Sequence, residues 1–187
     1  MRIKESKLLF DGWTRFLTLD VENPDGQRMS RAVLDHGESA CVLSYDVDRR
    51  VALLVSQERV PLLYLGLKEP SLEVIAGRLE PDESAEESIR REAEEEAGLR
   101  LGPLELVASC WASPGVSTER FSLYLGAYSV ADRIGRGGGR ADELENIEVK
   151  ELALSELARR ADQAAIKDAK TLLLIQTLRL RRPDLFT

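Results

Sequence analysis

Three glutamates near the middle of the chain have a spacing that suits metal chemistry. In the stretch RREAEEEAG, Glu92, Glu95 and Glu96 are spaced i, i+3 and i+4, so in a helix their carboxylates share one face. Like charges on one face are destabilising unless a cation neutralises them. Because no His or Cys stands nearby, the set suits a hard cation such as Mg²⁺, Mn²⁺ or Ca²⁺.

The same stretch carries the signals of the helix that this spacing requires. A proline interrupts the preceding strand, and Ser84 and Glu87 have the spacing of a capping box. Gly98 stands where a helix commonly ends in a left-handed residue. We therefore predict a helix over about 84–97.

A solvated acidic helix is the plainer interpretation, since runs of charge usually form exposed helix faces. A longer pattern surrounds the glutamates, however: from Gly77 to Leu99 the chain reads Gly-x5-Glu-x7-Arg-Glu-Ala-x-Glu-Glu-x-Gly-Leu. So many fixed positions make a chance match very rare, and the metal site is the stronger interpretation.

Composition narrows the class of protein. The 187 residues suffice for one well-buried domain with a small N-terminal annex, and 43% hydrophobic with 32% charged residues is typical of globular proteins. A net charge of -7 argues against a nucleic-acid-binding surface, which needs a basic patch. The single histidine, His36, stands in a turn-like stretch, which argues against histidine-based acyl chemistry.

Cysteine usage and hydropathy bear on location. Cys41 and Cys110 stand in apolar, strand-like stretches without a CxxC motif, so we expect free thiols. The N-terminus lacks the apolar core of a signal peptide, and the apolar run at 172–175 is too short to span a bilayer. We expect a cytoplasmic protein without a membrane partner.

The order of elements predicts an α+β fold. Residues 1–38 read as strand, Pro-Asp-Gly turn and strand, which indicates a small antiparallel sheet. Residues 39–187 alternate apolar strands with the predicted helix and end in a two-part helix over about 154–180. Mixed strands between helices predict an α/β/α sandwich. The glycine run at 135–140 lacks the context of a phosphate loop, and we interpret it as a hinge.

The pattern from Gly77 to Leu99 matches the Nudix box throughout, so the chain resembles the Nudix hydrolases. Outside the box, EVIAG, SPGVSTER and DAKTLLLIQTLR resemble the group of ADP-ribose and GDP-mannose pyrophosphatases over nearly the whole chain. The resemblance implies Mg²⁺- or Mn²⁺-dependent hydrolysis of a nucleoside diphosphate sugar to a nucleoside monophosphate and a sugar phosphate. A non-catalytic nucleotide-sugar sensor and a Nudix hydrolase of another nucleoside diphosphate derivative remain alternatives.

The resemblance also implies roles for residues of the box. Metal binding falls to oxygens of four residues: the carbonyl of Ala76, the carboxylates of Glu92 and Glu96 and, in an outer or third-metal contact, Glu83. Arg91 would hold the glutamates in place and Glu95 would support them.

A general base is implied on the loop at 135–149, where a carboxylate would take the proton of the attacking water. Glu145 is the first candidate, since it aligns through the following Ile-Glu-Val, and Glu143 is the second. The loop is about two residues longer than in the GDP-mannose group, so the choice between them stays open.

Substrate contacts are expected outside the box. Arg59 is a candidate for clamping a phosphate, or is a strand-end arginine at the surface. Glu73 and Glu119 resemble the polar contacts to the distal sugar and the attacking water. Trp13 and Phe16 either stack on the nucleobase or belong to the core.

The N-terminal annex bears on assembly. A segment of about 35 residues can hardly bury a core of its own. In the resembling group this segment packs on, or exchanges with, the partner subunit, and the active site draws on both chains. We therefore expect a homodimer.

Overall fold

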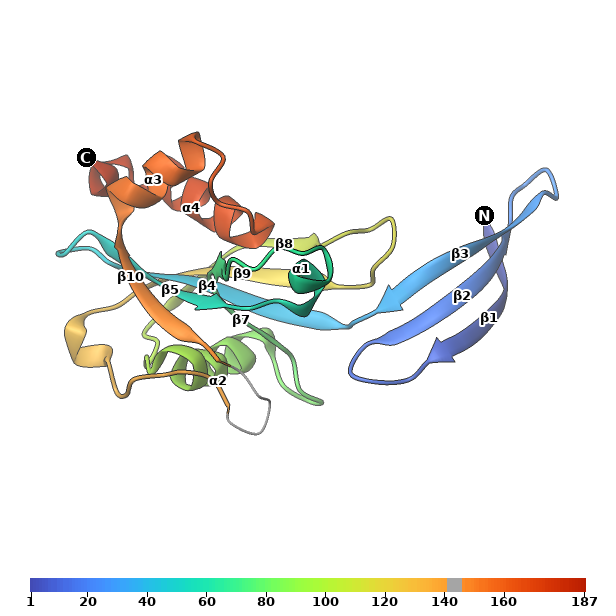
Figure 1. Ribbon diagram of the computed structural model, residues 1–187, viewed down its shortest axis with the longest axis horizontal. Helices are drawn as coiled ribbons and strands as arrows, with labels where there is room; N and C mark the ends of the chain where they lie inside the picture. The colour runs from blue at the N-terminus through green and yellow to red at the C-terminus, as the bar shows by residue number, and fades with distance from the viewer. Residues whose placement is uncertain (141–145) are drawn as a thin grey trace.

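The computed structural model describes residues 1–140 and 146–187, and its strands form two separate sheets (Figure 1). The first is antiparallel, in the order β1 (Arg2–Phe10), β2 (Arg15–Glu22) and β3 (Arg28–Asp35). Gly26, in the turn between β2 and β3, takes a φ of 81°, a conformation that glycine adopts without strain. The predicted N-terminal hairpin is thus present.

The second sheet has seven strands within the described residues. Its central order is β10-β5-β4-β9-β8, while β6 pairs with β5 and β7 pairs with β4. The pair β4–β9 is parallel and the other pairs are antiparallel, so the sheet is mixed, as predicted. The strands are β4 (Glu38–Asp46), β5 (Val51–Gln57), β6 (Ser71–Glu73), β7 (Ile75–Arg78), β8 (Leu104–Trp111), β9 (Arg120–Ala127) and β10 (Glu148–Ala153).

Helices cover both faces of this sheet. In Figure 1, α3 and α4 lie above it and α2 lies below it, which confirms the predicted α/β/α sandwich. The helices are the short α1 (Val60–Tyr64), α2 (Ala85–Ala97), α3 (Leu154–Asp162) and α4 (Ala169–Arg181), with 3₁₀ turns at η1 (Val130–Asp132) and η3 (Pro183–Phe186). No helix in the described part of the chain is long and apolar enough to cross a membrane.

The apolar run of β4 explains why the sheet is covered twice. Successive side chains of a strand point to opposite faces. Cys41 and Leu43 accordingly belong to the core under α3 and α4, whereas Ala40 and Val42 belong to the core under α2. All four are fully buried, as expected of a strand that is apolar without interruption.

Helix α2 begins and ends where the sequence predicts. The Ser84 hydroxyl accepts a hydrogen bond from the Glu87 amide (3.2 Å), and the Glu87 carboxylate accepts one from the Ser84 amide (2.8 Å). Gly98 ends the helix with a φ of 59°. Both ends are therefore fixed by local interactions, which holds the face that carries Glu92 and Glu96 in one orientation.

Two breaks interrupt the strands near the cavity. Strand β5 stops at Gln57, and Pro61 lies in the first turn of α1, which follows it. The segment 71–78 is divided into two strands: β6, which pairs with β5, and β7, which pairs with β4. At the break, the amide of Val74 donates to the Thr171 hydroxyl of α4 (2.8 Å) rather than to a neighbouring strand.

The glycine run, which we predicted to be a hinge, is hydrogen-bonded to the end of α2. The amides of Gly138 and Gly139 donate to the carbonyls of Glu96 and Glu95, at 2.9 and 3.1 Å. These carbonyls belong to the last turn of the helix, where partners within the helix are missing. The segment 137–139 is therefore attached to the helix that carries the acids of the box.

Candidate active site

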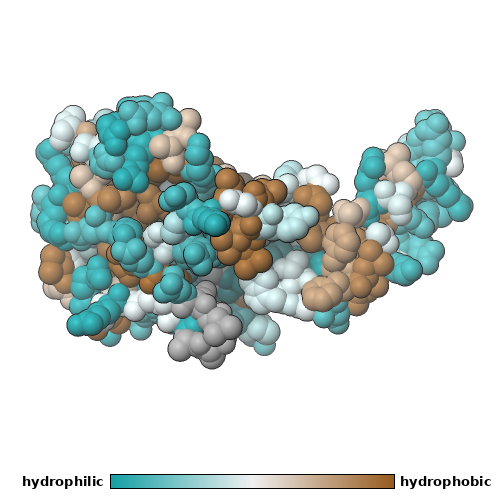
Figure 2. Space-filling model, viewed as in Figure 1, coloured by the Kyte–Doolittle hydropathy of each residue, from teal (hydrophilic) through white to brown (hydrophobic). Residues whose placement is uncertain are grey.

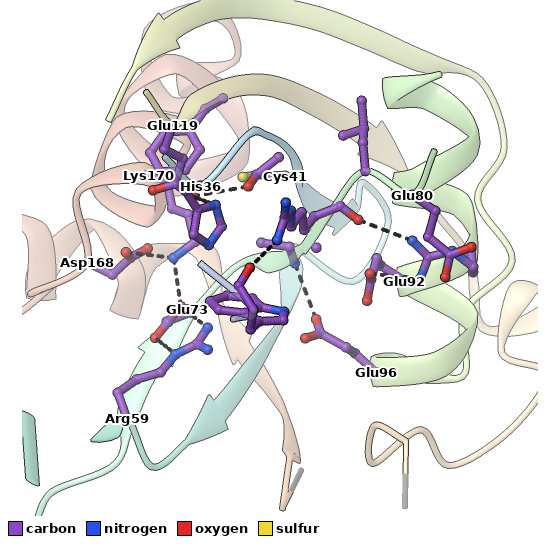
Figure 3. A pocket seen from close by; sticks show the side chains of 18 of the residues that line it. His36, Cys41, Arg59, Glu73, Glu80, Glu92, Glu96, Glu119, Asp168 and Lys170 are labelled. Carbon is purple, nitrogen blue, oxygen red and sulfur yellow. Dashed lines mark hydrogen bonds and ion pairs between the residues drawn. The ribbon is translucent and has the colours of Figure 1, made fainter. Parts of the chain in front are cut away.

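A cavity of about 800 Å³ opens beside α2, and most of the expected site residues line it. Figure 3 shows Glu92 and Glu96 on one wall, and Arg59, Glu73, Glu119 and Lys170 on the wall opposite. Strand β7 runs between the walls, and Trp13 reaches the rim from the turn between β1 and β2. Two walls with different chemistry therefore face the same cavity.

The first wall presents oxygen atoms along β7 and α2. Glu96 is only 2% exposed, and its carboxylate accepts a hydrogen bond from the Ala76 amide (3.2 Å). The carboxylate of Glu92 lies so close to Gly77 that a Cβ there would overlap it. Both acids therefore lie against the backbone that carries the Ala76 carbonyl.

Arg91 holds the remaining acids of the box. It makes two hydrogen bonds to Glu83 (3.0 and 3.1 Å), one to Glu92 (2.8 Å) and one to Glu95 (3.2 Å). The hydrogen bonds from Arg91 lower the pKa of Glu83, and those to Glu83 and Glu92 raise the pKa of Arg91. One guanidinium thus keeps three carboxylates together.

The oxygen donors fit a divalent cation. Carboxylates and a backbone carbonyl are the ligands that Mg²⁺ and similar hard ions take. Within residues 1–140 and 146–187, no three His, Cys, Asp or Glu side chains converge as a completed metal site. Glu143 and Glu145, the expected bases, lie outside the described residues, and their prediction stays open.

The second wall is a network of two cations and two acids. Arg59 binds Glu73 through two hydrogen bonds of 2.9 and 2.8 Å, and Lys170 binds Glu73 (2.6 Å) and Asp168 (2.8 Å). Asp168 also caps α4 by accepting from the Thr171 amide (2.9 Å). The network joins α4 to β6 and to the residue that precedes α1.

The charges of this network are shifted by their neighbours. Burial alone raises the pKa of Glu73, but the hydrogen bonds and charges of Arg59 and Lys170 outweigh it and lower the pKa to about 2. Burial likewise works against the charge of Lys170, but Glu73 and Asp168 raise its pKa. Arg59, Glu73 and Lys170 are therefore charged at neutral pH.

A polar cluster beyond the network surrounds Glu119, just before β9. Its carboxylate accepts a hydrogen bond from the Ser39 hydroxyl (3.1 Å) and lies 3.6 Å from Nδ1 of His36. Burial lowers the pKa of His36, although the charge of Glu119 opposes that shift. This cluster offers hydrogen-bond acceptors and donors of the kind that bind sugar hydroxyls.

The cavity gathers some of the predicted residues and leaves others out. Ala76, Arg91, Glu92, Glu96, Arg59, Glu73, Glu119 and Trp13 line it. Glu83 and Glu95 reach it through Arg91, whereas half-buried Phe16 lies within β2 opposite Phe10 and Leu34 and is not part of the lining.

The cavity lining also includes residues that the sequence reasoning did not place in the site, among them His36, Arg78, Asp168 and Lys170. A signal existed for Asp168, since an Asp before an apolar helix is a typical N-cap. Lys170 follows two residues later. For His36 and Arg78 the sequence holds no signal that we can name.

The mixed sheet between helical layers and the carboxylate-bearing α2 define the class of this protein. The family model of the NUDIX domain matches residues 35–174, which include the whole second sheet and α2. The chain belongs to the NUDIX family, whose members generally depend on a divalent metal ion.

Within this family, the chain is similar in sequence to several GDP-mannose pyrophosphatases. The chain is 41% identical over 170 residues to a GDP-mannose pyrophosphatase of Cronobacter sakazakii, covering 89% of this chain and 87% of the relative. It is 37% identical over 179 residues to that of Pectobacterium atrosepticum, covering 93% and 91%. It is 34% identical over 181 residues to that of Escherichia coli, covering 94% and 93%.

A solved structure shares the fold. The crystal structure of an ADP compounds hydrolase superposes with a TM-score of 0.76, over 98% of this chain and 94% of that chain. The sequence identity is 14%, so this likeness concerns the fold. It extends over the N-terminal sheet as well as the sandwich, since nearly the whole chain is covered.

Proposed function

We propose that this protein is a Nudix pyrophosphohydrolase that cleaves a nucleoside diphosphate sugar of the GDP-mannose or ADP-ribose type. The products are a nucleoside monophosphate and a sugar phosphate. The observation that carries the proposal is the two-walled cavity, with an oxygen-rich metal wall facing a wall of cations and sugar-binding groups. The relatives named GDP-mannose pyrophosphatase support the substrate class.

The first wall of the cavity, here called the metal wall, would bind the cation and the diphosphate. Glu92, Glu96 and the Ala76 carbonyl would hold Mg²⁺ or Mn²⁺. This ion would lower the pKa of a bound water and neutralise charge on the phosphates. Arg91 orients Glu92 while it keeps Glu83 and Glu95 nearby.

The second wall binds and orients the substrate. Arg59 and Lys170 place positive charge beside the cavity, which attracts the phosphates, and Glu73 fixes both cations. Glu119 offers a carboxylate to the distal sugar or to the attacking water. Our proposed base is a carboxylate of the loop after Arg140. Glu145 is the first candidate and Glu143 is the second.

We further propose a homodimer with the domain division 1–38 and 39–187. Every residue of β1 is exposed, among them Ile3 at 65% and Phe10 at 62%. On the sandwich, α1 and its flank expose Val60 and Tyr64 at 76% and 88%. Figure 2 shows apolar surface on both the N-terminal sheet and the body, on the face toward the viewer. A second copy would cover both.

The dimer is tested by sedimentation velocity on the wild type and on Leu8→Glu, which places a charge on β1. We expect a dimer for the wild type and a folded monomer for the variant. A monomeric wild type would contradict the proposal.

We also propose a cytoplasmic location. Cys41 and Cys110 are both free thiols, which supports it.

Substrate identity is tested by a product screen. Nucleotide sugars differing in base and sugar are incubated with Mg²⁺ or Mn²⁺, and the products are identified by mass. We expect a nucleoside monophosphate with a sugar phosphate. Tight binding of a nucleotide sugar without any product would favour the sensor alternative instead.

A further inference from the structure

Arg78 joins the N-terminal sheet to the floor of the cavity. It is the last residue of β7, and its guanidinium donates a hydrogen bond to the backbone carbonyl of Trp13. Its guanidinium carbon also lies 5.9 Å from the centroid of the Trp13 ring, within the range of a cation–π contact. Trp13 is thus held both by its backbone and by its indole.

A second ring supports the same indole. His36 meets Trp13 edge-to-face, with ring centroids 4.7 Å apart and an interplanar angle of 81°. This is a favoured arrangement for two aromatic rings. Despite these two contacts Trp13 remains 73% exposed, so much of its surface is open.

The backbone of Arg78 is tied to the metal wall. Its carbonyl accepts hydrogen bonds from Arg91 and from the Ser88 hydroxyl of α2, each at 3.4 Å. The Ala76 carbonyl stands two residues earlier in the same strand. Strand β7 therefore connects the position of the Trp13 indole to that of the proposed metal site.

An open indole at the rim of a cavity otherwise rich in charge suits a flat aromatic ligand. Aromatic side chains stack on nucleobases with little dependence on sequence, because every base has a π-face. We propose that Arg78 is a positioning residue that holds Trp13 as a stacking platform for the nucleobase. This rests on the proposed function, since it requires a substrate that carries a base.

The test separates binding from turnover. In a Trp111→Phe background, where Trp13 is the remaining tryptophan, Arg78→Ala should raise KM for the nucleotide sugar about 10-fold, with kcat changed less than 2-fold. Arg78→Lys should restore part of the loss, since it keeps the cation but not the fork. A fall in kcat with KM unchanged would overturn the proposal.

A double variant shows whether Arg78 acts through Trp13. If it does, adding Arg78→Ala to Trp13→Ala should raise KM no further. Additive effects would overturn the proposal, because Arg78 would then act on the substrate by itself. Arg100→Ala serves as control, since Arg100 is exposed and lies outside the cavity lining.

Trp13 fluorescence gives a readout that needs no turnover. In the Trp111→Phe background, GMP or AMP should quench Trp13 emission, and Arg78→Ala should lower both the quenching and the anisotropy of Trp13. Unchanged anisotropy and quenching in Arg78→Ala would overturn the positioning role. Absence of products in the substrate screen, with quenching intact, would instead refute the hydrolase while leaving the platform in place.

Discussion

The α-carbon of Gly77 lies directly against the carboxylate of Glu92, with no room for a methyl group between them. Gly77→Ala should therefore push Glu92 away from the Ala76 carbonyl. Since both oxygens belong to the proposed metal site, we expect metal affinity and kcat to fall by about 10–100-fold or more. Titration with Mn²⁺ and steady-state kinetics measure the two effects.

Gly115→Ala is the matched control for this variant. A Cβ at Gly115 meets nothing within 4 Å, and its backbone does not require a glycine. Its metal affinity and kcat should match those of the wild type. Equal behaviour of the two variants would contradict the close packing of Gly77 on Glu92.

Arg91→Lys tests whether the guanidinium fork organises the box. Lysine keeps the charge but cannot make the paired hydrogen bonds to Glu83 together with those to Glu92 and Glu95. We expect kcat to fall about 10–100-fold while far-UV circular dichroism stays the same. Wild-type kinetics would show that charge alone is enough.

Glu73 predicts a dependence of stability on acid. Its pKa of about 2 in the folded chain lies below its ordinary value of 4.5, so the carboxylate stabilises the fold above pH 4.5 and loses this effect as the pH falls toward 2. The shift corresponds to roughly 3 kcal/mol. Glu73→Gln should be less stable than the wild type at pH 6, by about 3 kcal/mol, since it removes the charge that pairs with Arg59 and with the buried Lys170.

Urea unfolding at pH 6 and pH 3 measures this dependence. The gap between wild type and Glu73→Gln should narrow at pH 3, where the wild type loses its advantage. Asp162→Asn is the control, because its pair with Arg179 is exposed and contributes little. A gap that stays constant between the two pH values would refute the assignment.

The sequence predicts helix α2 well because the residues that begin and end this helix act locally. The capping box of Ser84 and Glu87 spans four residues, and Gly98 needs only its own left-handed conformation. The strands of the sandwich follow from apolar runs that are buried on both faces, such as that of β4. Fold class and the acids of the box are therefore accessible without coordinates.

The opposite wall is not accessible in the same way. Lys170 and Glu73 are 97 positions apart, and Arg78 and Trp13 are 65 positions apart, so no local pattern joins them. The division of residues 71–78 into β6 and β7 likewise depends on Thr171 of α4. Contacts of this kind are set by tertiary packing, which spacing along the chain does not reveal.

The glycine run shows what tertiary contacts add to a local pattern. A run of glycines is typical of a flexible linker. Here Gly138 and Gly139 instead supply amides to the last turn of α2, and Gly137 packs on the backbone of Glu96 and Ala97. Glycine suits this segment because the two backbones approach closely at Gly137.

The turnover of Glu96→Gln tests the central claim most directly. Glu96 is buried beside Ala76, and glutamine keeps its size and its hydrogen-bonding oxygen while removing the charge that a cation needs. With GDP-mannose and Mg²⁺, the wild type should release GMP and mannose 1-phosphate. The variant should retain the fold and lose at least about 100-fold in kcat. Wild-type turnover by a folded Glu96→Gln would contradict the metal-dependent mechanism.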